Sequence, residues 1–163
     1  MKKMNYHILF LLLLIIGLAG CHAADTCRKS RIVDVGVGFY LDTINHLNNK
    51  LVVQKLTVDS IWVHGVEVDS LLYSNRKKLQ NIKLQLNVFA EESKFRFVFN
   101  EDVDTLTIRY KNTNHFLSLE CGYIRTHTID TVFSTRNFID SVAVVNESVN
   151  TIYVENIQIH HNK

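Results

Sequence analysis

Apolar and polar residues alternate along most of the chain after residue 31, with a period of two. In the run from Arg31 to Leu41, valine, phenylalanine and leucine alternate with glycine and polar residues. The run from Ile82 to Val88 is the most regular, with an aliphatic residue at every second position. Strict alternation predicts strands with one buried face. Gly36 and Gly38 lie on the opposite face of their strand, so we expect a neighbouring segment to pack closely over them.

Similar runs follow, separated by polar turn segments about every ten residues. They are Leu51–Val58 and Ser60–His64 (two strands, or one strand bent near Asp59-Ser60), Val66–Tyr73, Phe95–Phe99, Leu106–Tyr110, His115–Tyr123, Thr126–Phe133, Ile139–Val145 and Ile152–His160. Among the connections, Asp42–Lys50 is expected to be polar, Glu91–Lys94 a hairpin turn and Asn112–Asn114 a link. Helical spacing is not sustained after residue 31. About nine short strands of this kind predict an all-β domain, which we interpret as an antiparallel β-sandwich of the immunoglobulin-like type, with a small β-barrel as the alternative.

Strand parity also predicts two core positions. Trp62 shares a face with Val58 and Val66, which predicts a core anchor. Cys121 shares a face with Leu119 and with neighbouring apolar residues of its run, so we expect its thiol to point into the core. The connections between strands lack proline altogether, so asparagine, aspartate, glycine and serine must make the turns.

The first twenty-one residues have the order of a secretory signal. Lys2 and Lys3 precede an apolar run from Ile8 to Ile16, and Leu18-Ala19-Gly20-Cys21 closes it with small residues. The apolar run is about a dozen residues long, which is short for a membrane-spanning helix. The ending matches the bacterial lipobox, in preference to an ordinary signal peptide with a free cysteine. We expect a signal peptide at residues 1–20, a lipidated tether at 21–30 and a single β domain at 31–163.

Acylation of Cys21, with palmitate or similar chains, would anchor the domain stably to a membrane. Removal of the signal peptide lowers the basic count from 18 to 16, equal to the 16 acidic residues, so no basic surface for nucleic acid is expected. Only Asp25 is acidic between Cys21 and Cys27. Because an acidic cluster that would direct surface export is missing, we expect an outer-membrane lipoprotein that faces the periplasm.

Candidate chemistry is limited to cysteines, hydroxyls and histidines. In an oxidising periplasm, Cys27 and Cys121 are expected to form a disulfide, the alternative being a free Cys27 and a buried, inert Cys121. An Asp-Ser/Thr-aliphatic motif occurs six times, and we interpret it as turn chemistry at strand entry. It also resembles the O-glycosylation acceptor motif of Bacteroidetes secreted proteins. The candidate acceptors are Thr43, Ser60, Ser70, Thr105, Thr131 and Ser141.

The seven histidines after the signal peptide lack the spacing of a metal site and are interpreted as surface residues. His160 and His161, adjacent in a strand, should point to opposite faces. No serine has the context of a catalytic nucleophile, so no catalytic residue, metal or cofactor is predicted.

Several segments together resemble a family of small Bacteroidetes lipoproteins classed as a domain of unknown function. They are the lipobox, the early Cys27, Asp104-Thr105-Leu106-Thr107-Ile108-Arg109-Tyr110, Cys121-Gly122-Tyr123 and Glu155-Asn156-Ile157-Gln158-Ile159. The resemblance covers nearly all of the chain after Cys21 and implies compartment and fold, but no activity.

The sequence therefore favours a membrane-anchored, non-enzymatic structural or protein-interaction module of the cell envelope. Its partner is expected to be an envelope protein that docks on a sheet face or an edge strand. The alternative is a carrier of small ligands, with a barrel or cleft lined by aromatic residues. Those aromatics are Trp62, Phe95, Phe97, Phe99 and Tyr110.

Overall fold

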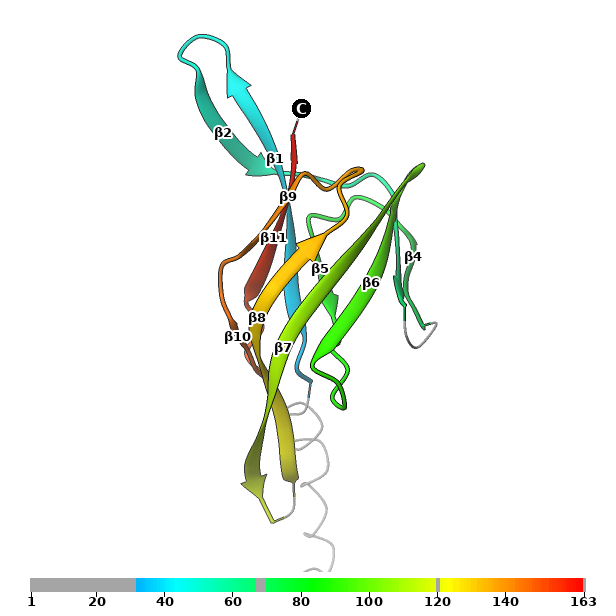
Figure 1. Ribbon diagram of the computed structural model, residues 1–163, viewed down its shortest axis with the longest axis vertical. Helices are drawn as coiled ribbons and strands as arrows, with labels where there is room; N and C mark the ends of the chain where they lie inside the picture. Colours follow the sequence, from blue (N-terminus) through cyan, green and yellow to red (C-terminus); the bar gives the residue numbers. More distant parts are fainter. Residues whose placement is uncertain (1–31, 67–69, 120, 163) are drawn as a thin grey trace, which may run out of the picture. The chain divides into compact units, whose positions relative to one another are not determined.

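In the computed structural model, which describes residues 32–66, 70–119 and 121–162, the alternating runs form eleven strands in two sheets (Figure 1). The first sheet contains β1 (Val35–Asn45), β2 (Lys50–Lys55), β5 (Asn81–Leu84), β9 (Ser141–Val144) and β11 (Glu155–Asn162). The second contains β3 (Ile61–Gly65), β4 (Ser70–Arg76), β6 (Glu92–Phe99), β7 (Asp102–Ser118), β8 (Gly122–Ser134) and β10 (Ser148–Val149). The all-β sandwich predicted from the sequence is confirmed.

Strand β1 is the centre of the first sheet, whose order is β2-β1-β11-β9. Along one edge β1 pairs first with β5 and then with β2, both antiparallel. Along its other edge it pairs with β11 in parallel, while all other paired strands of the described residues are antiparallel. The second sheet has the order β10-β8-β7-β6-β3-β4, so three consecutive strands form its middle.

Aromatic rings join the two sheets in the core. The ring of Phe39 from β1 meets that of Phe99 from β6 edge to face, with centroids 6.0 Å apart. Phe99 also stacks on Phe97 and on Phe138, at centroid distances of 5.7 and 4.3 Å. Because the inward positions of β1 and β6 are the alternating apolar residues of the sequence, the two strands bury one face each against the other sheet.

The two glycines of β1 allow the close packing expected from the sequence. A Cβ atom on Gly36 would collide with the backbone carbonyl of Val154, and one on Gly38 would collide with the carboxylate of Glu155. Asn156 secures the same region, since its Oδ1 accepts a 3.0 Å hydrogen bond from the Gly36 amide. Its Nδ2 donates to two carbonyls of the segment before and within β10, each at 2.9 Å. Asn156 thus links β1 and β11 to the β9–β10 connection.

Asp104 organises the connection between β8 and β9. It lies in β7 and is fully buried, and its carboxylate accepts four hydrogen bonds. One comes from the Thr135 hydroxyl at 2.6 Å and three from the backbone amides of residues 137, 138 and 139 at 2.7–2.9 Å. Burial alone would raise the pKa of this carboxyl, but the four donors outweigh burial and hold the pKa below its usual value.

Asparagine makes many of the turns in this proline-free chain, as expected. Asn49, Asn75 and Asn100 adopt the left-handed backbone conformation, with φ of 52°, 44° and 53°. Other asparagines, such as Asn45 and Asn87, accept a hydrogen bond from the amide two residues further along the chain. Turn chemistry that relies on asparagine therefore replaces the proline turns of an average domain.

Predictions made from strand alternation were wrong where the chain bends or turns. The buried residues of β3 are Ile61, Val63 and Gly65, so Trp62 lies half-buried on the other face instead of anchoring the core. The prediction took parity across the bend at Asp59-Ser60, where the alternation restarts. The expected hairpin turn at residues 91–94 is also wrong, because β5 and β6 belong to different sheets. Residues 112–114 are no link, since β7 continues through them.

Candidate functional site

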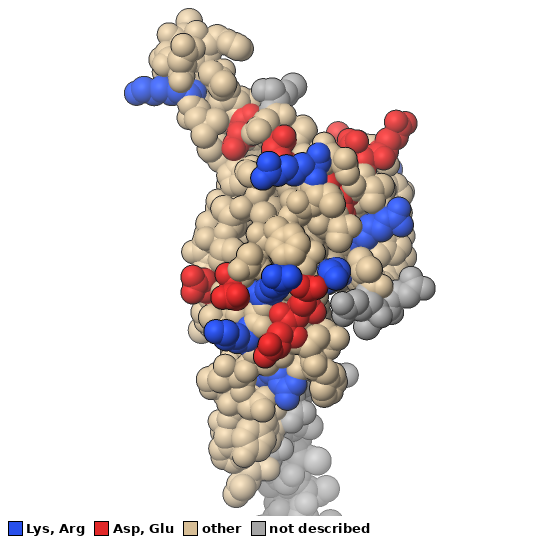
Figure 2. Space-filling view, in the orientation of Figure 1, with Lys and Arg blue, Asp and Glu red and all other residues tan. Residues whose placement is uncertain are grey.

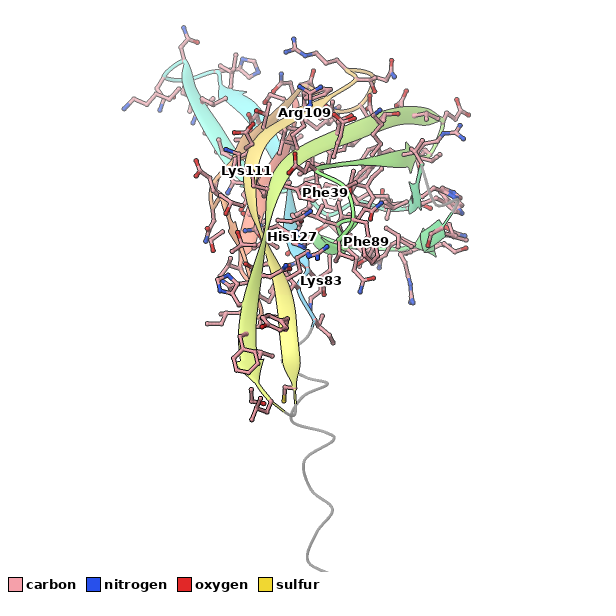
Figure 3. The ribbon with its side chains drawn as sticks, turned by 60° about the horizontal axis from the view of Figure 1, so that its bottom comes forward. Phe39, Lys83, Phe89, Arg109, Lys111 and His127 are labelled. Carbon is pink, nitrogen blue, oxygen red and sulfur yellow. The ribbon has the colours of Figure 1, made fainter. Side chains whose placement is uncertain are left out.

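A charged cluster on the second sheet lines a shallow pocket of about 420 Å³. Glu92 is paired there with Arg109 at 2.8 Å and with Lys94 at 3.1 Å. The hydrogen bonds from Arg109 and Lys94 lower the pKa of Glu92, so this carboxylate stays ionised at neutral pH. Arg109 and Lys111, labelled in Figure 3, both come from β7. Ion pairs at the surface contribute little to stability.

Below this surface, a buried polar network crosses from β6 to β8. The Tyr110 hydroxyl is 2.7 Å from Ser93 Oγ and donates to the Asn87 carbonyl at 2.8 Å. His127 is also buried, and its Nδ1 lies 2.6 Å from Asn112 Oδ1. Burial, with the positive charge of Arg125 nearby, lowers the pKa of His127. Ser93 bonds to a tyrosine and not to a histidine, so the network supports the sheet and does not resemble an activated serine.

The interpretation of all seven histidines as surface residues is therefore wrong for His127. The histidine lies in the middle of β8, where the alternation of that strand turns it toward the core (Figure 3). His160 and His161 are half-buried and do point to opposite sides, since Nδ1 of His160 lies 2.9 Å from Asp42 and Nδ1 of His161 lies 2.8 Å from the Phe138 carbonyl. Within residues 32–66, 70–119 and 121–162, no three potential ligands come together to hold a metal ion.

A second pocket, a cleft of about 400 Å³, lies between the β3–β4 hairpin and the connection from β5 to β6. Leu72, Leu86, Val88 and Phe95 supply much of its apolar lining. Of the five aromatic residues expected to line a ligand cleft, only Phe95 is found here. The side chains of Phe97, Phe99 and Tyr110 are buried in the core instead, as close packing of aromatic residues favours.

Two hairpins extend beyond the sandwich. One is the hairpin of β1 and β2, which we call the β1–β2 arm (residues 41–55). It projects from the sandwich as a two-stranded ribbon (Figure 1). All six residues of β2 are exposed, and the arm carries a set of exposed apolar side chains. They are Ile44, Leu47, Leu51, Val52 and Val53. Residues 42–50 were expected to be a polar connection, yet β1 continues to Asn45 within them.

Strands β7 and β8 also extend beyond the sandwich, as the β7–β8 arm (residues 111–128), at the end opposite to the β1–β2 arm (Figure 1). Its turn region exposes a second apolar set, which we call the apolar tip. The apolar tip consists of Phe116, Leu117, Leu119 and Tyr123. The expectation that this run is a core strand is wrong, because β7 ends at Ser118, β8 begins at Gly122, and Leu119 and Cys121 lie in a turn. In β7, residues 113–117 of this arm are exposed, whichever face of the hairpin they lie on.

Cys121 lies in that turn and not in the core. It is half-buried, its amide donates to Ser118 Oγ at 3.0 Å, and its sulfur is bonded in a disulfide. Cys21 and Cys27 both lie outside the described residues, so acylation of Cys21 and the pairing of Cys121 with Cys27 stay predictions. The signal peptide and the tether also lie outside the described residues. In the part that the structure does describe, no helix is long and apolar enough to cross a membrane.

The candidate glycosylation sites differ in accessibility. Thr131 and Ser141 are exposed, whereas Thr43, Ser60, Ser70 and Thr105 are half-buried. The interpretation of their aspartates as strand-entry turns is wrong for three motifs, since Asp42, Asp104 and Asp130 lie within strands. Asp104 bonds a connection more than thirty residues away, and Asp42 bonds His160.

Comparison with known families decides the relationship of the chain. A family model matches residues 60–161, which run from the residue before β3 to the next-to-last residue of β11. The chain belongs to a family of unknown function, DUF6452. The match confirms a domain-of-unknown-function family, and the DUF6452 region contains the whole second sheet but neither strand of the β1–β2 arm. No curated protein and no solved structure matches the chain.

Proposed function

We propose that the protein is a lipid-anchored, non-enzymatic interaction module of the cell envelope. In this proposal Cys21 carries the lipid, the anchor lies in the outer membrane, and the domain faces the periplasm. The Leu18-Ala19-Gly20-Cys21 motif supports the anchor, and the balanced charge of the remaining chain agrees with a partner that is a protein and not a nucleic acid.

The observation that carries the docking role is the β1–β2 arm. Ile44 and Leu47 are 59% and 96% exposed, so neither contributes to the core of this chain. Among the described residues β2 is an edge strand of its sheet, so its outer backbone groups can pair with a further strand. An extended segment of a partner can add to such an edge while apolar side chains on the ribbon supply the contact area. We therefore assign partner docking to this arm.

Anchoring is tested by the mass and the location of the mature protein in cells. We expect cleavage before Cys21, a mass increase that matches acyl chains, and incorporation of labelled palmitate, all lost in the Cys21→Ser variant. An unmodified mass for the wild-type chain in the membrane fraction would refute the anchor.

Docking is tested with a photocrosslinking amino acid at Leu51, in living cells. We expect a discrete crosslinked product, identified by mass spectrometry, that disappears in the Ile44→Ser/Leu47→Ser variant. Val145→Ser/Ile152→Ser is the control, because its residues are also largely exposed, 50% and 72%, and lie on neither arm. A crosslink that persists in the first variant, or disappears equally in both, contradicts docking by the β1–β2 arm.

A carrier of small apolar ligands is the second candidate, and the 400 Å³ cleft favours it. Leu86 is a buried residue of the cleft wall, while Val88 is partly exposed there. A hydrophobic fluorescent probe should bind to the wild type and not to Val88→Glu if the cleft takes ligands. Equal binding by the two proteins would remove this candidate.

A further inference from the structure

We infer that the apolar tip of the β7–β8 arm inserts into the surface of the bilayer that holds the lipid anchor. The inference rests on the proposed anchor at Cys21. It assigns a role to side chains that belong neither to the core nor to the β1–β2 arm. The surface that would bind the apolar tip is the lipid interface.

The first step is the composition of the apolar tip. Phe116 and Tyr123 face each other across the hairpin, with ring centroids 5.2 Å apart. Leu119 lies in the turn and is 97% exposed. These side chains hold the hairpin together locally but bury little of their surface. Phenylalanine, leucine and tyrosine at the end of a projecting element are the residues that enter the boundary between headgroups and acyl chains.

The second step is the distribution of charge along the β7–β8 arm. Among its described residues the full charges are Lys111 and Arg125, both positive, while the acidic Glu120 lies outside the described residues. Arg125 pairs with Asn114 across the hairpin and donates to its Oδ1 at 2.8 Å. This pair is three to four residues behind the turn, or roughly 10–13 Å. In Figure 2 the described residues at the end of the arm carry no charge, and basic residues are set back from that end. A cation at that depth can contact lipid phosphates while the tip reaches the acyl boundary.

The third step is the tether. The disulfide of Cys121 lies in the turn of the apolar tip. In the proposed pairing its partner is Cys27, six residues from the acylated Cys21. Six extended residues span at most about 20 Å, and a disulfide adds roughly 6 Å between Cα atoms. The tip is therefore confined close to the lipid attachment point, whereas the β1–β2 arm projects from the opposite end of the sandwich (Figure 1).

The experiment uses the full-length mature lipoprotein in vesicles of phosphatidylethanolamine and phosphatidylglycerol with brominated acyl chains. A tryptophan is introduced by Leu119→Trp or, as the matched control, by Leu47→Trp at the turn of the other arm. Each variant is measured against the parent chain, whose single tryptophan is Trp62. We expect brominated lipid to remove roughly half of the emission added by L119W, as for a side chain at the acyl boundary. L47W should lose none and should remain accessible to iodide in the water phase.

The outcomes separate this inference from the anchor. If the parent chain is acylated and floats with vesicles, but L119W behaves like L47W, tip insertion is overturned while the anchor stands. If the parent chain is not acylated and does not float, the anchor fails and the inference fails with it. Shielding of L119W that depends on protein concentration, and not on brominated lipid, identifies contact with a second copy and also overturns insertion. Circular dichroism of each variant checks that the sandwich is folded.

Discussion

Replacement of Asp104 should be among the most destabilising single changes in the domain. Asp104→Ala removes the acceptor of four hydrogen bonds, and bonds to a charged group contribute about 1.5–3 kcal/mol each. Of the four donors, only the amide of Ile139 belongs to a fully buried residue, and Thr135 and Asn137 are exposed enough for water to replace the carboxylate. The expected loss is therefore about 3–5 kcal/mol, below the simple sum.

The assay is urea unfolding followed by the emission of Trp62, which is half-buried on β3. With a slope of about 1–3 kcal/mol per molar urea, the midpoint should fall by roughly 1–5 M. Asp102→Ala, an exposed aspartate two residues earlier in β7, is the control and should leave the midpoint nearly unchanged. A midpoint shift for Asp104→Ala no larger than that of the control would refute the role of the carboxylate.

The pH dependence provides an independent check on the same group. The pKa of Asp104 is lower in the folded chain than its ordinary value of 3.8. Its contribution to the free energy of unfolding is therefore fully present above pH 3.8 and is lost as the pH falls through the lowered folded value. Asp104→Asn lacks this titration, so the difference between wild type and variant should shrink in acid. A difference that stays constant down to pH 2 would show that another interaction is responsible.

The remaining predictions concern packing, cross-linking and modification. Gly36→Ala should cost about 1–3 kcal/mol in thermal or urea unfolding, because its methyl group meets backbone that cannot move cheaply, whereas Gly38→Ala meets the end of a flexible side chain and should cost less. The mature protein should contain no alkylatable thiol before reduction, and Cys27→Ser/Cys121→Ser should lower stability by about 4–5 kcal/mol if the loop-entropy account holds. Intact mass of protein from its own host should show any O-glycan, and loss of added mass in Thr131→Ala would place a glycan at an exposed site.

The sequence predicted the sandwich because period-two alternation is a property of each strand by itself. It placed β1, β5 and β6 within a few residues and identified the glycines over which β11 packs. It could not predict which strands pair, since the parallel contact of β1 with β11 joins segments more than a hundred residues apart. Asp104 escaped notice for the same reason. Its sequence neighbours resemble a turn, while its four donors lie thirty-one to thirty-five residues away.

The alternation that predicted the strands did not distinguish the exposed arms from buried strands. The regular apolar spacing of Leu117, Leu119, Cys121 and Tyr123 was interpreted as a buried face. A hairpin turn interrupts that spacing, and no strand within residues 32–66, 70–119 and 121–162 buries Leu119 or Tyr123. A pattern of apolar residues indicates a surface whose burial is favourable. It does not show whether the chain itself or another molecule buries that surface. The signal that distinguished this run was present in Cys121-Gly122, where Gly122 adopts φ of 68° as a turn requires.

The two arms have different consequences because of where each leaves the sandwich. The β7–β8 arm carries Cys121, whose sulfur is bonded in a disulfide. Under the proposed pairing with Cys27 and the proposed anchor at Cys21, the turn of this arm would be the part of the domain nearest the lipid. The β1–β2 arm leaves from the opposite end, so a domain held by the first arm would present the second away from the bilayer (Figure 1). Its exposed leucines would then meet proteins of the periplasm before they met lipid. Breaking the Cys27–Cys121 bond should therefore reduce the Leu51 crosslink without changing acylation, whereas an arm that docks independently of orientation would keep its crosslink.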